Sequence, residues 1–194
     1  KIKATTQKGT TEALTVTNTP YPKASFLTDV EQLDILAAPR SFYMMSQSGF
    51  DTHLPQQALS NGLEVTREYQ DDSGKNVSSV AQGAELNVVL RVRSTTGKNI
   101  SDVAIIDLLP GGFEILRDSV RNKYNHWQSE YTDIREDRVI FYGDFGDMMT
   151  ELTYKVKVTA AGRFVVPPVY AESMYDLSVK AHSQSGHVDV TAAK

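Results

Sequence analysis

Apolar and polar residues alternate along several short runs of this chain. In the first run Leu63, Val65 and Tyr69 share one parity, with polar residues between them. Two later runs, 86–93 and 151–158, repeat the pattern. Because successive side chains of a strand point to opposite faces, each run has one dry face and one wet face. The alternation therefore predicts amphipathic β-strands.

Two other runs, 103–109 and 139–142, are apolar on both parities and are typical of central strands. Turn-forming pairs such as Pro110-Gly111 and Ala161-Gly162 separate the runs. Many short strands at this spacing favour a mainly β fold, an antiparallel β-sandwich. A single short helix is expected over 113–124, where Ile115, Leu116 and Val120 lie near helical spacing.

The first 58 residues carry weaker signals. Short strands are expected at 12–18, 33–36 and 41–46, with prolines between them. We therefore expect a partial β segment at 1–58, either the C-terminal strands of a preceding domain or a docking linker. The sandwich domain is expected at 59–194.

Composition excludes several functions. The 194 residues contain no cysteine, carry a formal net charge of −4 and have a pI of about 5.6. A disulfide scaffold, a cysteine-ligated zinc site and a thiol nucleophile are excluded, and the acidic balance argues against nucleic acid. Apolar runs of only a few residues indicate neither a membrane span nor a signal peptide. The first residue is Lys1, so we expect a fragment of a longer protein.

The sequence predicts no catalytic residue, metal site or cofactor. None of the four histidines lies in a nucleophile motif, and His182, His187 and Asp189 match no standard metal spacing. The triplet at 144–146 spells a kinase metal motif, but the other kinase motifs are missing. The acidic stretch 130–151 is interpreted as a solvated face rather than a pair of catalytic carboxylates.

A weak partner surface is predicted around the expected helix. Its candidate residues are Arg117, Arg121, Lys123 and Trp127. Basic and aromatic side chains together can anchor a protein partner. The alternative is that Trp127 packs beneath a long loop.

Several ordered segments resemble the C-terminal end of bacterial alpha-2-macroglobulin-like proteins. The segments are Gln47-Ser48-Gly49-Phe50-Asp51, Gly62-Leu63-Glu64-Val65-Thr66-Arg67-Glu68-Tyr69, Asp107-Leu108-Leu109-Pro110-Gly111-Gly112-Phe113-Glu114, Asp133-Ile134-Arg135-Glu136-Asp137-Arg138-Val139 and Thr159-Ala160-Ala161-Gly162 through Tyr175-Asp176. They occur in order over roughly residues 41–183.

The resemblance implies a very large extracytoplasmic protein built of macroglobulin-like sandwich domains. Such proteins trap endopeptidases after cleavage of a bait region, and many carry a thioester in an upstream domain. The implied partners are other domains of the same polypeptide and target proteases. The implied location is the periplasm, with an upstream lipid anchor. The last domain of the animal relatives binds a receptor through a basic helix, and this role is not transferred to residues 113–125.

The leading hypothesis is thus a structural and interaction domain of a bacterial alpha-2-macroglobulin-like endopeptidase inhibitor. The alternative is a β-sandwich binding or adhesion module of a surface protein, which the strand pattern fits equally well. A hydrolase domain is the third possibility, and it would require a deep pocket lined by carboxylates of the 130–151 stretch.

Overall fold

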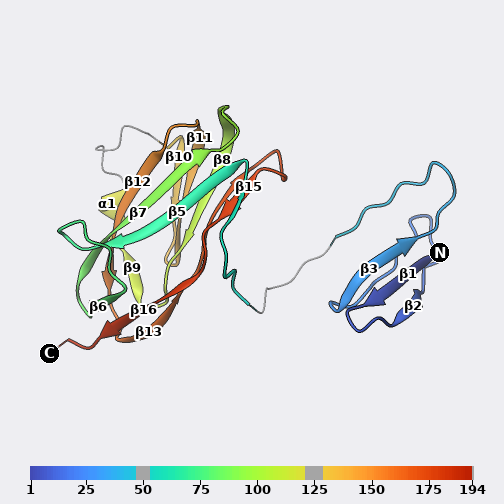
Figure 1. Ribbon diagram of the computed structural model, residues 1–194, viewed down its shortest axis with the longest axis horizontal. Helices are drawn as coiled ribbons and strands as arrows, with labels where there is room; N and C mark the ends of the chain where they lie inside the picture. Colours follow the sequence, from blue (N-terminus) through green and yellow to red (C-terminus); the bar gives the residue numbers. More distant parts are fainter. Residues whose placement is uncertain (47–52, 121–128, 194) are drawn as a thin grey trace. The chain divides into compact units, whose positions relative to one another are not determined.

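The computed structural model describes residues 1–46, 53–120 and 129–193. The chain divides into two compact units, Lys1–Phe50 and Asp51–Lys194 (Figure 1). We call them unit 1 and unit 2 and describe each by itself. No helix in the described parts of the chain is long and apolar enough to cross a membrane.

Unit 1 is a three-stranded antiparallel sheet. Its order is β2 (Thr11–Leu14), β1 (Ile2–Thr6), β3 (Val30–Ile35). The register places Ile2 opposite both Leu14 and Ile35, so one face of the sheet is apolar. Ala4 is its one fully buried apolar residue among those described. A sheet this thin cannot cover its own apolar face.

The strand expected at 41–46 is wrong, because the structure has no strand there. Phe42 and Met44 are 97% and 94% exposed, so the side chains of this segment have no packing partner within unit 1. Strand propensity needs a neighbouring strand and a packed face to act on, and the segment has neither. The strands expected near 12–18 and 33–36 are confirmed in shorter or shifted form as β2 and β3.

Unit 2 is a sandwich of two main antiparallel sheets (Figure 1). The six-stranded sheet has the order β10 (Tyr131–Ile134), β11 (Arg138–Phe145), β8 (Ile100–Leu108), β14 (Val169–Ser173), β15 (Lys180–His182), β4 (Leu59–Asn61). The four-stranded sheet has the order β5 (Leu63–Gln70), β7 (Glu85–Ser94), β12 (Thr150–Val158), β9 (Phe113–Ile115). A small third sheet joins β13 (Gly162–Val166), β16 (Gly186–Thr191) and β6 (Ser79–Ala81).

The core lies between the two main sheets and follows the alternation of the sequence. The four-stranded sheet turns inward its apolar parity, including Leu90, Leu152 and Val156, all at most 2% exposed. The six-stranded sheet contributes Val103, Ile105 and Phe145. The predicted antiparallel β-sandwich is confirmed, and the both-parity runs form β8 and β11 at the centre of their sheet.

The helix expected over 113–124 is wrong in its first part. Residues 113–115 form strand β9, which pairs with β12, and helix α1 has only four residues, Arg117–Val120. Phe113 is buried and meets the ring of Tyr69 edge-on at 5.5 Å, while Glu114 points outward. Residues 113–115 therefore form a strand rather than a helix, because they can pair with the edge of β12. The remainder, residues 121–124, lies outside the described residues.

A β-bulge interrupts the pairing of β8 with β11. Between the pairs Gly143–Val103 and Phe145–Ile100, two residues of β8 face one of β11. The extra residue, Asp102, has a φ of 54°, and its backbone N–H donates to Asp144 at 3.0 Å. The Asp144 carboxylate thus closes the bulge, a structural use of the aspartate in the kinase-like triplet.

Candidate functional site

Three loops gather at one end of the unit 2 sandwich, and we call this region the loop end. They are residues 95–99, 146–149 and 174–179, each joining two strands (Figure 1). Backbone bonds hold the loops to the adjoining chain: Ser94 N–H donates to Gly146 O at 2.7 Å, and Met174 N–H donates to Asp102 O at 2.8 Å. Backbone hydrogen bonds therefore hold the loops of the loop end in place.

Large apolar side chains are exposed on the loop end. Met148, Tyr175 and Leu177 are each about 80% exposed, and Met149 and Met174 about half exposed. Clustered exposed apolar residues are a mark of interaction surfaces, whereas single ones are ordinary. Methionine and tyrosine are also residue types that interfaces favour.

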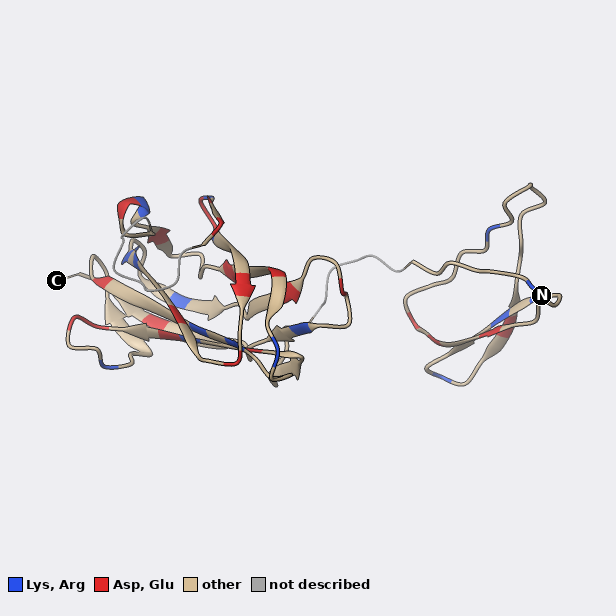
Figure 2. Cartoon of the chain, turned by 90° about the horizontal axis from the view of Figure 1, so that it is seen from above, with Lys and Arg blue, Asp and Glu red and all other residues tan. Residues whose placement is uncertain are grey.

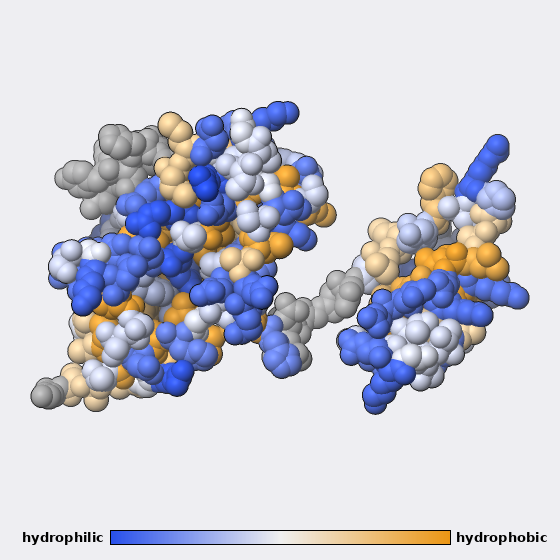
Figure 3. Space-filling view, in the orientation of Figure 1, coloured by the Kyte–Doolittle hydropathy of each residue, from blue (hydrophilic) through white to orange (hydrophobic). Residues whose placement is uncertain are grey.

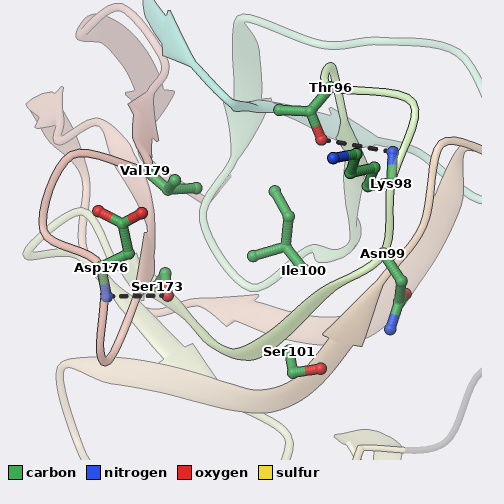
Figure 4. Close-up of a pocket in the computed structure, with 8 residues that line it drawn as sticks. All are labelled: Thr96, Lys98, Asn99, Ile100, Ser101, Ser173, Asp176 and Val179. Atoms are coloured by element: carbon green, nitrogen blue, oxygen red, sulfur yellow. Dashed lines mark hydrogen bonds between the residues drawn. The ribbon is translucent and has the colours of Figure 1, made fainter.

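A depression of about 450 Å³ opens beside these loops (Figure 4). It is lined by Thr96, Lys98, Asn99, Ile100, Ser101, Ser173, Asp176 and Val179. None of the carboxylates of the 130–151 stretch lines this depression.

Polar groups of the depression form hydrogen bonds within their own loop. Ser173 Oγ accepts from Asp176 N–H at 3.3 Å (Figure 4). Asp176 Oδ1 accepts from Ser178 Oγ at 2.6 Å. The Ser178 hydrogen bonds lower the pKa of Asp176, which keeps it ionised at neutral pH. An ionised carboxylate cannot serve as a general acid, and no lining residue forms a nucleophile–base pair. The chemistry here is loop stabilisation.

A buried ion pair crosses the core between the two main sheets. Arg67 of β5 donates to the carboxylate of Asp107 on β8, and both side chains are at most 3% exposed. Arg67 also donates to the carbonyl oxygens of Leu108, at 3.1 Å, and Pro167. The second carboxylate oxygen accepts from the hydroxyl of Tyr154 on β12 at 2.6 Å. The partners of Arg67 and Asp107 lie on β8, on β12 and in the loop between β13 and β14, so the group links the two main sheets.

The surroundings tune the ionisable groups of this cluster. Burial lowers the pKa of Arg67, but the charge and hydrogen bond of Asp107, together with Tyr69 and Tyr154, outweigh burial, and the pKa is raised. Burial raises the pKa of Tyr69 and of Tyr154. The Arg67 guanidinium stacks 5.2 Å from the Tyr69 ring centre, and the Tyr69 hydroxyl has no hydrogen-bond partner among the described residues. Arg67 therefore stays charged over the physiological range, and the cluster contributes structure rather than catalysis.

Sequence reasoning missed this cluster, although a signal was present. Arg67 stands on the apolar parity of the first run, and Asp107 shares the parity of Val103 and Ile105. Opposite charges on two inward faces indicate a buried pair, since an unpaired charge there is prohibitively costly. The distance between the strands in sequence concealed the pairing.

The predicted partner surface is only partly visible. Arg117 begins helix α1 and donates to Ile134 O at 3.4 Å. Arg121, Lys123 and Trp127 lie outside the described residues. The four residues therefore remain a prediction.

The histidine and acidic candidates are dispersed. His182 lies on β15, and Asp189 on β16 approaches Arg163 at 3.8 Å. No group of three potential ligands gathers for a metal among the residues that the structure describes. In the acidic stretch Asp133 pairs with Arg135 at 2.8 Å and Asp137 with Arg138 at 2.6 Å.

Comparisons with known sequences find similarity to bacterial alpha-2-macroglobulins. Residues 62–176 match the family described as the bacterial alpha-2-macroglobulin MG10 domain. The alpha-2-macroglobulin homolog of Yersinia pestis is 40% identical in an alignment of 182 residues that covers 81% of this chain. The alpha-2-macroglobulin of Pasteurella multocida is 39% identical in an alignment of 174 residues that covers 87% of this chain. The chain spans 9% of the length of each of these relatives.

Solved structures share the fold. Native Escherichia coli alpha-2-macroglobulin, from domain MG7 to the C-terminus, matches 73% of this chain and 25% of its own with a TM-score of 0.65 at 21% identity. A Salmonella alpha-2-macroglobulin mutant matches 92% of this chain and 13% of its own with the same TM-score and identity.

Proposed function

Because the chain belongs to the bacterial alpha-2-macroglobulin family, we propose that it is a structural and interaction domain of an endopeptidase inhibitor. The full-length protein would trap a protease after cleavage of a bait region outside these residues. Unit 2 is a structural β-sandwich module rather than an enzyme. The observation that carries the proposal is the family match over residues 62–176, which hold most of the sandwich core.

Within the inhibitor, unit 2 would act as a rigid body that other domains of the polypeptide contact. The buried Arg67–Asp107 pair supports this role, because it fastens the two sheets to each other. The exposed apolar residues of the loop end, such as Met148 and Tyr175, supply a contact surface. A module that transmits movement after bait cleavage needs both a stiff core and contact surfaces.

Unit 1 would be the last part of a preceding domain. Its sheet has one apolar face and only one fully buried apolar residue among those described, Ala4, so it needs a partner to be stable. The parent protein would reside in the periplasm, held there by an upstream lipid anchor. An adhesion module remains compatible with the sandwich, but no observation beyond the fold favours it.

The inhibitor role can be tested with the full-length protein and two proteases, trypsin and porcine elastase. We expect a complex of altered mobility on native gels and loss of activity toward large protein substrates. The absence of complex and inhibition with every protease tried would contradict the proposal.

The part played by this domain needs two variants. Asp107→Ala leaves Arg67 unpaired in the core, which costs about 3–5 kcal/mol and should impair trapping. The matched control Asp137→Ala breaks an exposed pair, worth about 0–1 kcal/mol, and should trap normally. Normal trapping by a protein whose unit 2 is shown to be unfolded would mean that the domain is dispensable.

A further inference from the structure

One asparagine–glycine pair occurs in the sequence, at Asn61-Gly62. Asparagine is a thermolabile residue, because a backbone nitrogen can attack the carbon of its side-chain amide. Glycine in the next position favours this attack, since it has no side chain to shield its nitrogen. The pair therefore has the chemistry of a spontaneous modification site.

The pair lies at a corner of the unit 2 sandwich. Asn61 ends β4, the three-residue edge strand of the six-stranded sheet, and Leu63 begins β5 of the four-stranded sheet. The chain thus passes from one main sheet to the other at Gly62. Asn61 is exposed, and Figure 3 shows hydrophilic residues over much of the surface of unit 2. Water therefore reaches the side-chain amide.

The backbone of the corner requires glycine at position 62. Gly62 has a φ of 80°, a conformation that other residues rarely adopt. A Cβ atom built there would also lie 3.1 Å from Cγ1 of Val179. The N–H of Thr95 donates to Gly62 O at 2.9 Å and holds the corner in this shape. The fold therefore keeps the residue that leaves Asn61 open to attack.

The side chain of Asn61 has a structural role. Its Nδ2 donates to Ser178 O, in the 174–179 loop of the loop end, at 2.8 Å. In Figure 1 the first residues of β5 lie beside β15, which follows this loop. The loop carries Tyr175 and Leu177, both about 80% exposed. A carboxylate in place of the amide would have no donor for Ser178 O, so the loop would lose this hydrogen bond.

We propose that Asn61 is a site of spontaneous deamidation, and that its product releases the 174–179 loop from β4. The Gly62 backbone nitrogen attacks Asn61 Cγ and loses its proton, the Cγ–Nδ2 bond breaks, and ammonia leaves. The succinimide ring so formed takes up one water molecule, which breaks one of its two ring C–N bonds. Opening at Cγ gives aspartate. Opening at the Asn61 carbonyl carbon gives isoaspartate, whose main chain is one carbon longer.

The fold slows this reaction but does not prevent it. Asn61 pairs with Lys180 of β15, and its amide is held by Ser178, so the ring closes only after both contacts open. Opening the end of a short edge strand is a local event that costs much less than global unfolding. The reaction therefore proceeds in the folded chain, more slowly than in the unfolded chain.

The product is compatible with a folded sandwich. Lys180 stands directly opposite Asn61 in the strand register, and opposite charges in that arrangement are favourable. Figure 2 shows acidic and basic residues together on the strands of unit 2. A new carboxylate at Asn61 therefore changes the corner and the 174–179 loop, whereas the core between the two main sheets is retained.

The first test is ageing of the 194-residue chain at 37 °C and neutral pH, followed by peptide mapping with mass spectrometry. We expect Asn61 to deamidate at least threefold faster than Asn76 and Asn99, which are also exposed but precede the β-branched Val77 and Ile100. Isoaspartate should be the larger product, and isotopically labelled water should enter it. An Asn61 rate no higher than those of Asn76 and Asn99 would overturn the proposal.

The second test measures the loop by hydrogen exchange of the backbone amides of residues 174–179. Asn61→Asp reproduces one product, and Asn61→Ala removes the donor without adding charge; both should speed exchange at least threefold. The control Asn18→Asp adds the same charge in unit 1 and should change nothing. Unchanged exchange in both Asn61 variants would contradict release of the loop, and faster exchange in Asn61→Asp alone would attribute it to charge instead. Circular dichroism shows whether each variant keeps its fold.

Neither test involves a protease. The inference is therefore independent of the proposed inhibitor role and can fail or hold separately from it.

Discussion

Two tyrosines stand beside the same buried ion pair, and their hydroxyl groups are treated differently. Tyr154 donates to Asp107 at 2.6 Å, whereas the hydroxyl of Tyr69 has no partner among the described residues. A buried hydrogen bond to a charged group stabilises, and a buried hydroxyl without a partner does not. The two positions therefore offer a comparison within one cluster.

We expect Tyr154→Phe to lower the free energy of unfolding by about 1.5–3 kcal/mol, because the buried carboxylate loses a donor. Tyr69→Phe should change it by less than about 0.5 kcal/mol or raise it, since nothing is lost but an unpaired hydroxyl. Urea unfolding followed by fluorescence measures both. Equal losses in the two variants would show that Tyr69 is bonded in solution.

The same tyrosines predict a loss of stability in alkali. Burial raises the pKa of both in the folded state, whereas an unfolded tyrosine ionises near pH 10. Above that pH the unfolded chain releases protons that the folded chain retains, so the free energy of unfolding falls as pH rises. Each tyrosine contributes up to about 1.4 kcal/mol per pH unit, and the full stability is present below pH 10.

Urea titrations between pH 8 and 11.5 measure this slope. Tyr69→Phe should make the decrease of the unfolding free energy with pH shallower, by up to about 1.4 kcal/mol per pH unit. A slope unchanged in that variant would mean that Tyr69 ionises in the folded state as readily as in the unfolded chain.

At the scale of elements, the turn between β8 and β9 lies close against β13 of the small third sheet. A Cβ atom built on Gly112 would lie 2.6 Å from the ring of Phe164 on β13, but one on Gly111 meets nothing within 4 Å. Neither glycine has a positive φ. The two neighbours thus differ only in the space around them.

Gly112→Ala should therefore destabilise unit 2 by about 1–3 kcal/mol through overpacking against Phe164. Gly111→Ala should leave stability unchanged or raise it by up to about 1 kcal/mol, because alanine restricts the unfolded chain. Thermal unfolding of both variants tests this. A stable Gly112→Ala protein would show that the Phe164 ring moves aside freely.

The sequence predicted the long strands well and the short strands poorly. Strands β5, β7 and β12 could be predicted because eight to ten residues of alternation leave little ambiguity. Strands β4, β6 and β9 have three residues each, too short to carry a period, and exist because a neighbouring edge accepts them. The sequence indicated that Arg67 and Asp107 are charges on core-facing strand positions, but the order of the strands was needed to see that they pair. The loop end could not be predicted without the strand order, since its three loops are distant in sequence.

At the scale of the whole molecule, the two units differ in the size of their hydrophobic cores. Every member of the main core cluster lies between Leu63 and Val190. Among the residues that the structure describes, nine of the exposed large apolar ones lie in unit 1, including Tyr21, Leu27 and Phe42. Apolar burial is the main stabilising term of folding, so only unit 2 has a sufficient core.

We expect residues 53–194 alone to unfold cooperatively at the same temperature as the whole chain. Residues 1–50 alone should show no cooperative transition. Circular dichroism melts of the three proteins measure this. A melting temperature of residues 53–194 lowered by more than about 5 °C would show that unit 1 stabilises unit 2.

The sheet order also has a consequence for synthesis. Strand β4 pairs with β15, and β6 pairs with β16, so the first strands of unit 2 bond to its last, about 120 residues later. At about 5–20 residues per second, a ribosome needs roughly 6–24 s to make that stretch. During this interval β4 and β6 have no strand to pair with. The six-stranded sheet and the small third sheet therefore cannot be completed until the last strands of unit 2 have been synthesised.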